Sequence, residues 1–281
     1  MKVVKTVSEL RDAVSAARQS GQNIGLVPTM GALHKGHGAL IDRARAESGC
    51  VVVSIFVNPI QFDKKEDYEK YGRAMESDLA FCRERGTDLV FAPDEAEMYP
   101  QPQRVFVEAR ALSEYLCGMF RPGHFRGVAT VVTKLFNMVQ PDRAYFGEKD
   151  AQQLAIIQAI AADLNMPITI VPVATVREED GLAISSRNVR LDTDQRSRAA
   201  TLYRALRAAA DRLASGARPV EARLAAINVL REQPSIRVEY LEIVDPQTMR
   251  PVEEIHGPVR VAAAVWIGET RLIDNVLQVH R

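Results

Sequence analysis

The chain has 281 residues, of which 47% are apolar and 26% charged, and this is ordinary composition for a globular protein. Lysine plus arginine balance aspartate plus glutamate at 36 each, so no overall field recruits nucleic acid or an acidic membrane. An anionic substrate must therefore be held by a local cluster of side chains. The length suggests two domains and a core that is stable without disulfides or metals.

The three cysteines, at positions 50, 82 and 117, are too widely spaced to indicate a zinc site or a disulfide framework. No apolar run approaches the ~18–20 residues that span a bilayer. The first residues also lack the apolar stretch of a signal peptide. We therefore expect a soluble cytoplasmic protein without a nucleic-acid or membrane partner.

Short apolar runs alternate with helical patterns through the first two thirds of the chain. Continuous apolar strands separated by helices are typical of a parallel sheet covered on both faces. The predicted fold class is α/β, with a Rossmann-like doubly wound domain over residues 1–176 whose ligands lie at the carboxyl ends of the strands. The predicted strands are 24–27, 50–57, 88–92, 144–146 and 168–173, and the predicted helices are 38–47, 78–85, 128–139 and 151–164.

The pattern changes after residue 177. Two helices, over 194–214 and up to about residue 232, precede two alternating stretches, 237–244 and 259–267, that are typical of antiparallel strands. This predicts a smaller α+β domain over residues 177–281. In the first domain, the polar stretch 58–73 has weak periodicity and is a candidate for a mobile lid.

The segment Pro28–His37 (PTMGALHKGH) follows a predicted strand and opens a predicted helix. Its two glycines permit a tight turn, and the N–H groups and dipole of a helix start favour a phosphate. His34 and His37 could both donate hydrogen bonds as negative charge builds on that phosphate. Two histidines at this spacing, taken alone, more often form a structural turn, and a zinc site lacks a third ligand nearby. The strand before and the helix after favour a nucleotide site.

A second segment, Phe146–Asp150 (FGEKD), also lies between a predicted strand and a predicted helix. Lys149 offers a cation for phosphate, and Asp150 could hold a nucleotide hydroxyl or a magnesium-bound water. Taken alone this is a weak signal, because such residues commonly cap helices.

Three further segments combine polar groups that suit anions or hydroxyls, and each has a plain structural alternative. The hydroxyls and arginine of Ile184–Asn188 (ISSRN) can cradle a polyphosphate, or form a hydrophilic loop between domains. The amides of Phe56–Phe62 (FVNPIQF) suit a hydroxyl or carboxylate ligand, although Asn-Pro is also a turn signal. The basic loop Arg121–Gly127 (RPGHFRG) could attract an anion or only face solvent.

Together these segments resemble the pantothenate synthetase (pantoate–β-alanine ligase) family, within the wider superfamily of HxGH nucleotidyltransferases and class I aminoacyl-tRNA synthetases. The resemblance rests on order and approximate spacing and spans nearly the whole chain. Its motifs are PTMGALHKGH, VSIFVNPIQF, RPGHFRGVATVV, YFGEKDAQQ, DGLAISSRN and the closing Arg271–Asn275 (RLIDN).

The resemblance implies a carbon–nitrogen ligase of pantothenate and coenzyme A biosynthesis. Such an enzyme joins (R)-pantoate to β-alanine with ATP and Mg²⁺, through a pantoyl-adenylate intermediate, and releases AMP and pyrophosphate. It also implies a homodimer. Because the adenylate reacts with water, the stretch 58–73 would serve as a lid.

The resemblance also implies roles for individual residues, with His37 as proton donor and no residue assigned as a metal ligand. The implied catalytic residues are His37, His34, Lys149, Ser185 and Arg187. The implied ATP-binding residues are Met30, Gly31, His34, His37, Gly147, Glu148, Lys149, Asp150, Val176, Ile184, Ser185, Ser186 and Arg187. The implied binding residues for pantoate and β-alanine are Gln61, Gln153, Asn58 and Arg121.

Three positions depart from the family pattern. Ile184 stands where methionine is frequent and is expected to alter packing near adenine. Gly72 stands where proline is frequent and should loosen the lid, since glycine lacks proline's fixed φ. Ala151 stands where an aromatic residue is usual. None of the three removes a polar catalytic group.

Two other functions use the same fold. One is another small-molecule nucleotidyltransferase with the two-histidine signature, and Gln61 and Gln153 argue against it. The other is a non-catalytic nucleotide-binding or regulatory protein, which would be favoured if His37 or Lys149 were replaced.

Overall fold

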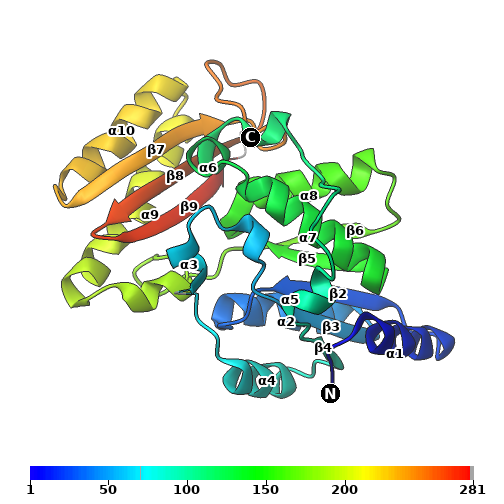
Figure 1. The fold of residues 1–281 in the computed structure, drawn as a ribbon. Helices are drawn as coiled ribbons and strands as arrows, with labels where there is room; N and C mark the ends of the chain where they lie inside the picture. Colours follow the sequence, from blue (N-terminus) through cyan, green and yellow to red (C-terminus); the bar gives the residue numbers. More distant parts are fainter. Residues whose placement is uncertain (70, 279–281) are drawn as a thin grey trace. The chain divides into compact units, whose positions relative to one another are not determined.

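The computed structural model describes residues 1–69 and 71–278 (Figure 1). Contacts within the chain divide it into two compact units. The first unit comprises Met1–Ala109, Arg121–Glu148 and Ile156–Ala174, and the second comprises Arg110–Phe120, Lys149–Ala155 and Thr175–Arg281.

The first unit is built on a six-stranded parallel sheet in the order β1-β4-β3-β2-β5-β6. Its strands are β1 (Lys2–Val4), β2 (Ile24–Thr29), β3 (Cys50–Ile55), β4 (Leu89–Phe91), β5 (Arg143–Gly147) and β6 (Thr169–Val173). Its helices are α1 (Val7–Gln19), α2 (Lys35–Glu47), α3 (Lys65–Glu69), α4 (Met75–Glu84), α5 (Glu95–Met98), α7 (His124–Val139) and the second part of α8 (Ala151–Asp163), with the 3₁₀ turn η1 (Pro59–Gln61).

Helices cover both faces of this sheet. Ile41 of α2 and Cys82 of α4 share one buried cluster with Val27, Val51 and Val90, which lie on β2, β3 and β4. Side chains alternate along a strand, so the strand residues between those of this cluster point to the opposite face of the sheet. Helices α1 and α7 pack against each other and against β2. Every residue of β3 is buried. This confirms the predicted doubly wound α/β fold.

The strand order reverses between β2 and β5. From β2 the sheet grows through β3 and β4 in one direction, and from β5 it grows through β6 in the other. In open α/β sheets the crevice at such a reversal, outside the carboxyl ends of the strands, is where ligands bind. The segments that follow these two strands are the ones that begin at Met30 and at Glu148.

The second unit holds an antiparallel sheet in the order β7-β8-β9 with two long helices packed on it. Leu202 and Leu206 of α9 are fully buried in one core cluster with Leu230 of α10 and Val261 of β8. This confirms the predicted smaller α+β portion of the fold. Its elements are η2 (Ala111–Ser113), α6 (Leu116–Phe120), the start of α8, η4 (Ser186–Arg190), α9 (Thr193–Ala214), α10 (Pro219–Arg231), β7 (Ile236–Val244), β8 (Val259–Ile267) and β9 (Thr270–Gln278), and the turn η3 (Glu148–Asp150) ends in it.

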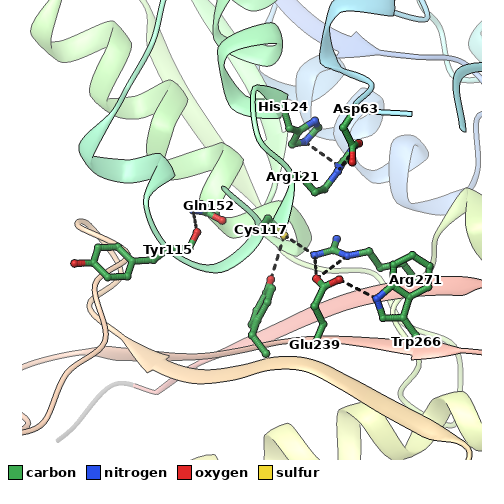
Figure 2. A network of polar contacts seen from close by, with 10 residues as sticks. Asp63, Tyr115, Cys117, Arg121, His124, Gln152, Glu239, Trp266 and Arg271 are labelled. Atoms are coloured by element: carbon green, nitrogen blue, oxygen red, sulfur yellow. Dashed lines mark hydrogen bonds and ion pairs between the residues drawn. The ribbon is translucent and has the colours of Figure 1, made fainter. Parts of the chain in front are cut away.

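A β-bulge in β7, between Val238 and Tyr240, places Glu239 on the sheet face opposite the core of the second unit. There the Glu239 carboxylate accepts hydrogen bonds from Trp266 Nε1 at 2.8 Å and from Arg271 Nε at 2.9 Å (Figure 2). Arg271 Nη2 also donates to Cys117 Sγ on α6, at 3.4 Å. This buried ion pair ties all three strands of the sheet to α6.

Several elements were not predicted from the sequence, among them α1, β1, β9 and the short helices α3, α5 and α6. Helix α1 buries only Leu10 and Val14, and its clearest signal is the capping box of Thr6 and Glu9. Strands β1 and β9 were also missed. Among the predicted elements, α2 begins at Lys35 rather than residue 38, since His34 caps it ahead of its first apolar residue.

None of the helices within residues 1–69 and 71–278 combines the length and the apolar character that crossing a bilayer requires.

Candidate active site

The turn after β2 adopts a backbone that few residues tolerate. Gly31 has φ +80° and Ala32 has φ +50°, both in the left-handed region. The carboxylate of Asp78, on α4, accepts hydrogen bonds from Ala32 N at 2.9 Å and Leu33 N at 2.7 Å. A Cβ on Gly31 would lie 2.9 Å from Asp78 Oδ2, so glycine is required for this contact. The buried carboxylate therefore fixes the turn that leads into α2.

His34 and His37 together cap the first turn of α2. His34 is the N-cap, and its Nδ1 accepts the Gly36 N–H at 3.1 Å, while His34 N donates to His37 Nδ1 at 3.3 Å. The ring centroids are 4.1 Å apart. Since each Nδ1 accepts a backbone N–H, each neutral imidazole carries its proton on Nε2. The arrangement fixes two N–H donors of known tautomer at the start of a helix.

Asn58 and Gln61 form a buried amide pair after β3. Asn58 Nδ2 donates to Gln61 Oε1 at 3.0 Å, and Gln61 Nε2 lies 3.1 Å from Met30 Sδ. Asn58 Oδ1 accepts from the Tyr99 hydroxyl at 2.7 Å. Thioether sulfur is a weak acceptor. Within the part of the chain that the structure describes, the Gln61 amide N–H groups thus meet this weak acceptor, and they suit a carboxylate or hydroxyl ligand.

Helix α7 lies directly against this amide pair. A Cβ on Gly127 would lie 2.4 Å from the Ile60 carbonyl oxygen and 2.6 Å from Gln61 Cα, both backbone atoms. The Gly127 carbonyl oxygen also accepts a hydrogen bond from Asn58 Nδ2 at 3.2 Å. The last glycine of RPGHFRG thus permits the close approach that holds η1.

Arg121 lies between an acidic side chain and an imidazole (Figure 2). Its Nη2 is 3.4 Å from Asp63 Oδ1, and its Nη1 is 3.1 Å from His124 Nε2. His124 Nδ1 is 2.8 Å from the Gln61 carbonyl oxygen, which can only accept, so His124 carries its proton on Nδ1 and Nε2 accepts from Arg121. The basic loop is therefore joined to the Gln61 segment and is more than a solvated surface.

In the second unit, a small cavity is lined by Lys149, Ser185, Arg187 and Asn188. Ser185 Oγ accepts the Arg187 N–H at 3.2 Å and so caps the short helix η4. The Asp150 carboxylate lies 3.8 Å from Lys149 Nζ. Arg271 and Asp274 of β9 line the same cavity, so it contains one lysine, two arginines and a serine hydroxyl beside one carboxylate. Lysine, arginine and hydroxyl donors of this kind are typical of phosphate binding.

The remaining predicted residues of the second unit lie around this loop or on α8. Ile184 is buried, and its N–H donates to the Val176 carbonyl oxygen at 3.0 Å. Gln153 is half-buried on α8. Its neighbour Gln152 has a structural role, because its Nε2 donates to the Leu112 carbonyl oxygen at 2.8 Å. It also donates to the Tyr115 carbonyl oxygen at 2.7 Å (Figure 2).

The two units divide the predicted site residues between them. The first unit contains Met30, Gly31, His34, His37, Asn58, Gln61, Arg121, Gly147 and Glu148, and the second contains Lys149, Asp150, Gln153, Val176, Ile184, Ser185, Ser186 and Arg187.

Sequence reasoning missed several polar residues of these segments: Asp78, Tyr99, His124, Arg177 and Asp274. Asp78 is 46 residues from Ala32, whose N–H it binds. No local pattern could pair them. His124 and Asp274 stood inside recognised motifs, but the fixed ring nitrogen of His124 and the pairing of Asp274 with Arg177 could not be foreseen.

Comparisons with known proteins agree along the whole chain. The sequence profile of the Pantoate-beta-alanine ligase family matches residues 2–277. Pantothenate synthetase from Moorella thermoacetica is 50% identical over 278 residues, 99% of this chain and 98% of that protein.

Solved structures give the same result. The crystal structure of pantothenate synthetase from Thermus thermophilus has a TM-score of 0.94 and 48% identity, with 100% of both chains covered. That of pantoate-beta-alanine ligase from Francisella tularensis, complexed with beta-gamma ATP and beta-alanine, has a TM-score of 0.82 and 32% identity, covering 99% of this chain and 97% of that one. The chain therefore belongs to the pantoate-beta-alanine ligase family and is an enzyme that joins pantoate to β-alanine.

Proposed function

We propose that the enzyme uses ATP to activate (R)-pantoate as pantoyl adenylate and then transfers the pantoyl group to β-alanine. The observation that carries the proposal is the capped helix start, where His34 and His37 hold two Nε2–H donors after β2. Helix N-termini of this kind favour phosphate. The Francisella tularensis relative, complexed with beta-gamma ATP and beta-alanine, supports these two substrates.

In the first step, a pantoate carboxylate oxygen attacks the α-phosphorus of ATP. The bond from that phosphorus to its bridging oxygen breaks, and pyrophosphate leaves. Negative charge grows on the phosphate oxygens during attack, so donors already in place stabilise the transition state. His37 is the proposed donor to those oxygens, and His34 supports it through the backbone hydrogen bond between them.

In the second step, the amine of β-alanine attacks the acyl carbon of pantoyl adenylate. The acyl–oxygen bond breaks, AMP leaves, and the nitrogen loses a proton as the amide forms. Adenylation makes this possible, because a free carboxylate is a poor electrophile and AMP is a good leaving group.

The cationic cavity of the second unit supplies the groups proposed to hold the phosphates. Lys149 and Arg187 line it with the Ser185 hydroxyl, and Ser186 follows at the start of η4. Arginine and lysine compensate the charge of the departing pyrophosphate. Met30, Gly31, Gly147, Glu148, Val176 and Ile184 are the proposed lining of the nucleotide site.

The proposed pantoate site is the amide pair of the first unit. Gln61 and Asn58 are neutral, so they can hold the hydroxyls and carboxylate of pantoate without binding the anion too tightly to react. Gln153 and Arg121 complete the proposed binding set for pantoate and β-alanine.

The few carboxylates near the proposed phosphate site suit a Mg²⁺ ion that is held chiefly by the phosphates of ATP. Among residues 1–69 and 71–278, no group of three or more His, Cys, Asp or Glu side chains could hold a metal. Mg²⁺ usually binds one or two carboxylates together with substrate phosphates. Asp150, whose side chain is 47% exposed beside Lys149, is the proposed carboxylate, and the ion would neutralise phosphate charge.

Further features of the proposal rest on the sequence, and the homodimer rests on the family resemblance. They are a homodimer, a cytoplasmic location, a boundary between domains near residues 176–177, and closure of the stretch 58–73 as a lid. Lys70, within that stretch, lies outside the described residues.

Isotope exchange between pyrophosphate and ATP tests the first step, and AMP release on adding β-alanine tests the second. The expected exchange requires pantoate and Mg²⁺, is lost when the metal is chelated, and precedes AMP release. Exchange that ignores pantoate would contradict the proposed substrate while leaving nucleotidyl transfer in place.

A further inference from the structure

Strand β9 carries the segment Arg271–Asn275, to which the proposed reaction assigns no role although four of its residues line the cavity of Lys149 and Ser185. Within it, Asp274 is only 4% exposed. Its carboxylate accepts two hydrogen bonds from the Arg177 guanidinium, at 2.6 Å from Nη1 and 3.0 Å from Nη2. Two-point pairs of this kind are strong and geometrically specific. Asp274 therefore fixes the position and direction of Arg177.

Arg177 in turn holds the loop that follows it. Its Nη1 donates to the Gly181 carbonyl oxygen at 3.0 Å. Its guanidinium carbon lies 4.0 Å from the centroid of the Tyr203 ring, on α9. The guanidinium is thus held by the carboxylate, a backbone oxygen and an aromatic face, and it can move little without breaking several contacts.

The loop held by Arg177 leads directly to the proposed phosphate-binding residues. The backbone before and after the loop pairs as a short antiparallel bridge between Arg177 and Ala183. Next to this bridge, Ile184 N donates to the Val176 carbonyl oxygen at 3.0 Å. Ser185 follows Ile184 directly in the sequence. A shift of Arg177 would therefore be passed to Ser185 through one short segment of backbone.

The neighbouring Asn275 holds the other phosphate-binding segment. Its Nδ2 donates to the Lys149 carbonyl oxygen at 3.0 Å, and its own N–H donates to Asp274 Oδ1 at 2.7 Å. Arg260, on β8, donates to Asn275 Oδ1. Two adjacent residues of one strand thus hold Lys149 and the loop of Ser185.

Asp274 also balances charge near a site that must bind anions. Burial raises the pKa of Asp274, and hydrogen bonds and charge from Arg177, with the charge of Lys149, oppose that rise. Without this carboxylate, the Arg177 guanidinium would be a largely buried charge without its partner, which is costly.

We propose that Asp274 is a positioning residue for the adenylation step, acting through Arg177 on Ser185 and through Asn275 on Lys149. It lines the same cavity as Lys149 and Ser185, and both oxygens of its carboxylate accept from Arg177. It links the two proposed phosphate-binding segments of the second unit, the loop through Arg177 and the Lys149 segment through Asn275. The inference rests on the proposed phosphate-binding roles of Lys149, Ser185 and Arg187.

The first test is Asp274→Asn, which keeps the shape and removes the charge. The expected result is a fall of about 10- to 100-fold in the rate of pantoate-dependent pyrophosphate exchange, because small displacements of positioning groups have effects of this size. The KM for pantoate should stay within about twofold, since the proposed pantoate amides make uniform binding contacts elsewhere. The matched control is Glu242→Gln, which breaks the ion pair between Glu242 of β7 and Arg223 of α10, 3.0 Å apart. Exchange should not change in this variant.

A double variant, Asp274→Leu with Arg177→Met, separates positioning from stability. Replacing a buried ion pair by apolar residues is often neutral or stabilising. The thermal midpoint of the double variant should therefore lie close to that of the wild type, while its exchange rate stays low. Recovery of exchange together with the midpoint would overturn the inference, as would normal exchange in Asp274→Asn. A wild-type enzyme without pantoate-dependent exchange would instead overturn the proposed function, and this inference with it.

Discussion

At the scale of single residues, the two histidines show how a capping geometry can supply the proposed catalytic donors. Ser, Thr, Asp and Asn are the usual N-caps, because a short side chain accepts a backbone N–H. Here His34 takes that place through Nδ1, and His37 accepts the His34 N–H in the same way. The capping bonds use Nδ1 of both rings, so the two protons lie on Nε2.

His37→Ala removes one of these donors. We expect the adenylation rate to fall by ~10²-fold or more, the usual cost of removing a transition-state donor, while ATP binding weakens far less. Pyrophosphate exchange and equilibrium ATP titration measure the two effects. The control is His256→Ala, an exposed histidine paired only with Glu254 among its described contacts, which should leave both unchanged. Unchanged turnover in His37→Ala would mean that this histidine is structural.

Cysteine reactivity gives a second prediction. Cys50, Cys82 and Cys117 are all buried as free thiols, and burial raises the pKa of Cys82 to about 11. The thiolate is the reactive species, so at pH 8 only about one Cys82 side chain in a thousand is ionised. We expect no rapid reaction with a thiol reagent such as DTNB until the protein is unfolded, after which all three should react. Rapid labelling of Cys82 in the native enzyme would contradict its burial.

At the scale of elements, the close contact of α7 with η1 shows how a glycine, because it has no side chain, allows one segment to position another. The amides of Asn58 and Gln61 follow β3, but their placement depends on a helix that begins at His124. Gly127 permits the contact because only hydrogen occupies the space beside the Ile60 carbonyl oxygen. The glycine of the basic motif therefore acts on the amide motif.

Gly127→Ala would place a methyl group against backbone that cannot move aside easily. We expect a loss of about 1–3 kcal/mol in the free energy of unfolding, typical of overpacking, and a raised KM for pantoate as η1 shifts. Urea denaturation and steady-state kinetics measure these. Gly257→Ala is the control, since a Cβ there has no heavy atom within 4 Å. Equal stability and equal KM in the two variants would show that α7 tolerates the methyl group.

At the scale of the whole molecule, the chain builds two separate compact units, each with its own core. Parallel strands and their helices bury one cluster around Val27 and Ile41, and the α9–α10 pair buries another against β8. The chain passes between the units more than once, because α6 and the start of α8 group with the second. The proposed site residues are correspondingly divided between the two units.

The core of the second unit can be weakened without touching any proposed site residue. Leu206→Ala removes a fully buried side chain of α9 and should lower the free energy of unfolding by about 2–5 kcal/mol. Leu224→Ala, at a position 51% exposed on α10, is the control and should change it by less than about 0.5 kcal/mol. Denaturant unfolding followed by circular dichroism distinguishes them, and equal midpoints would contradict the packing described for α9.

The sequence by itself determined the α/β class, most strands and helices, and the family. Apolar runs such as Cys50–Ile55 are local signals of buried strands, and the motifs keep their chemistry in short segments. Tertiary structure alone decided which distant groups meet. Asp78 reaches the turn at Ala32, and Asp274 pairs with Arg177 across 97 residues of sequence. Such contacts form only when sheet order and helix packing bring the segments together, so local patterns carry no record of them.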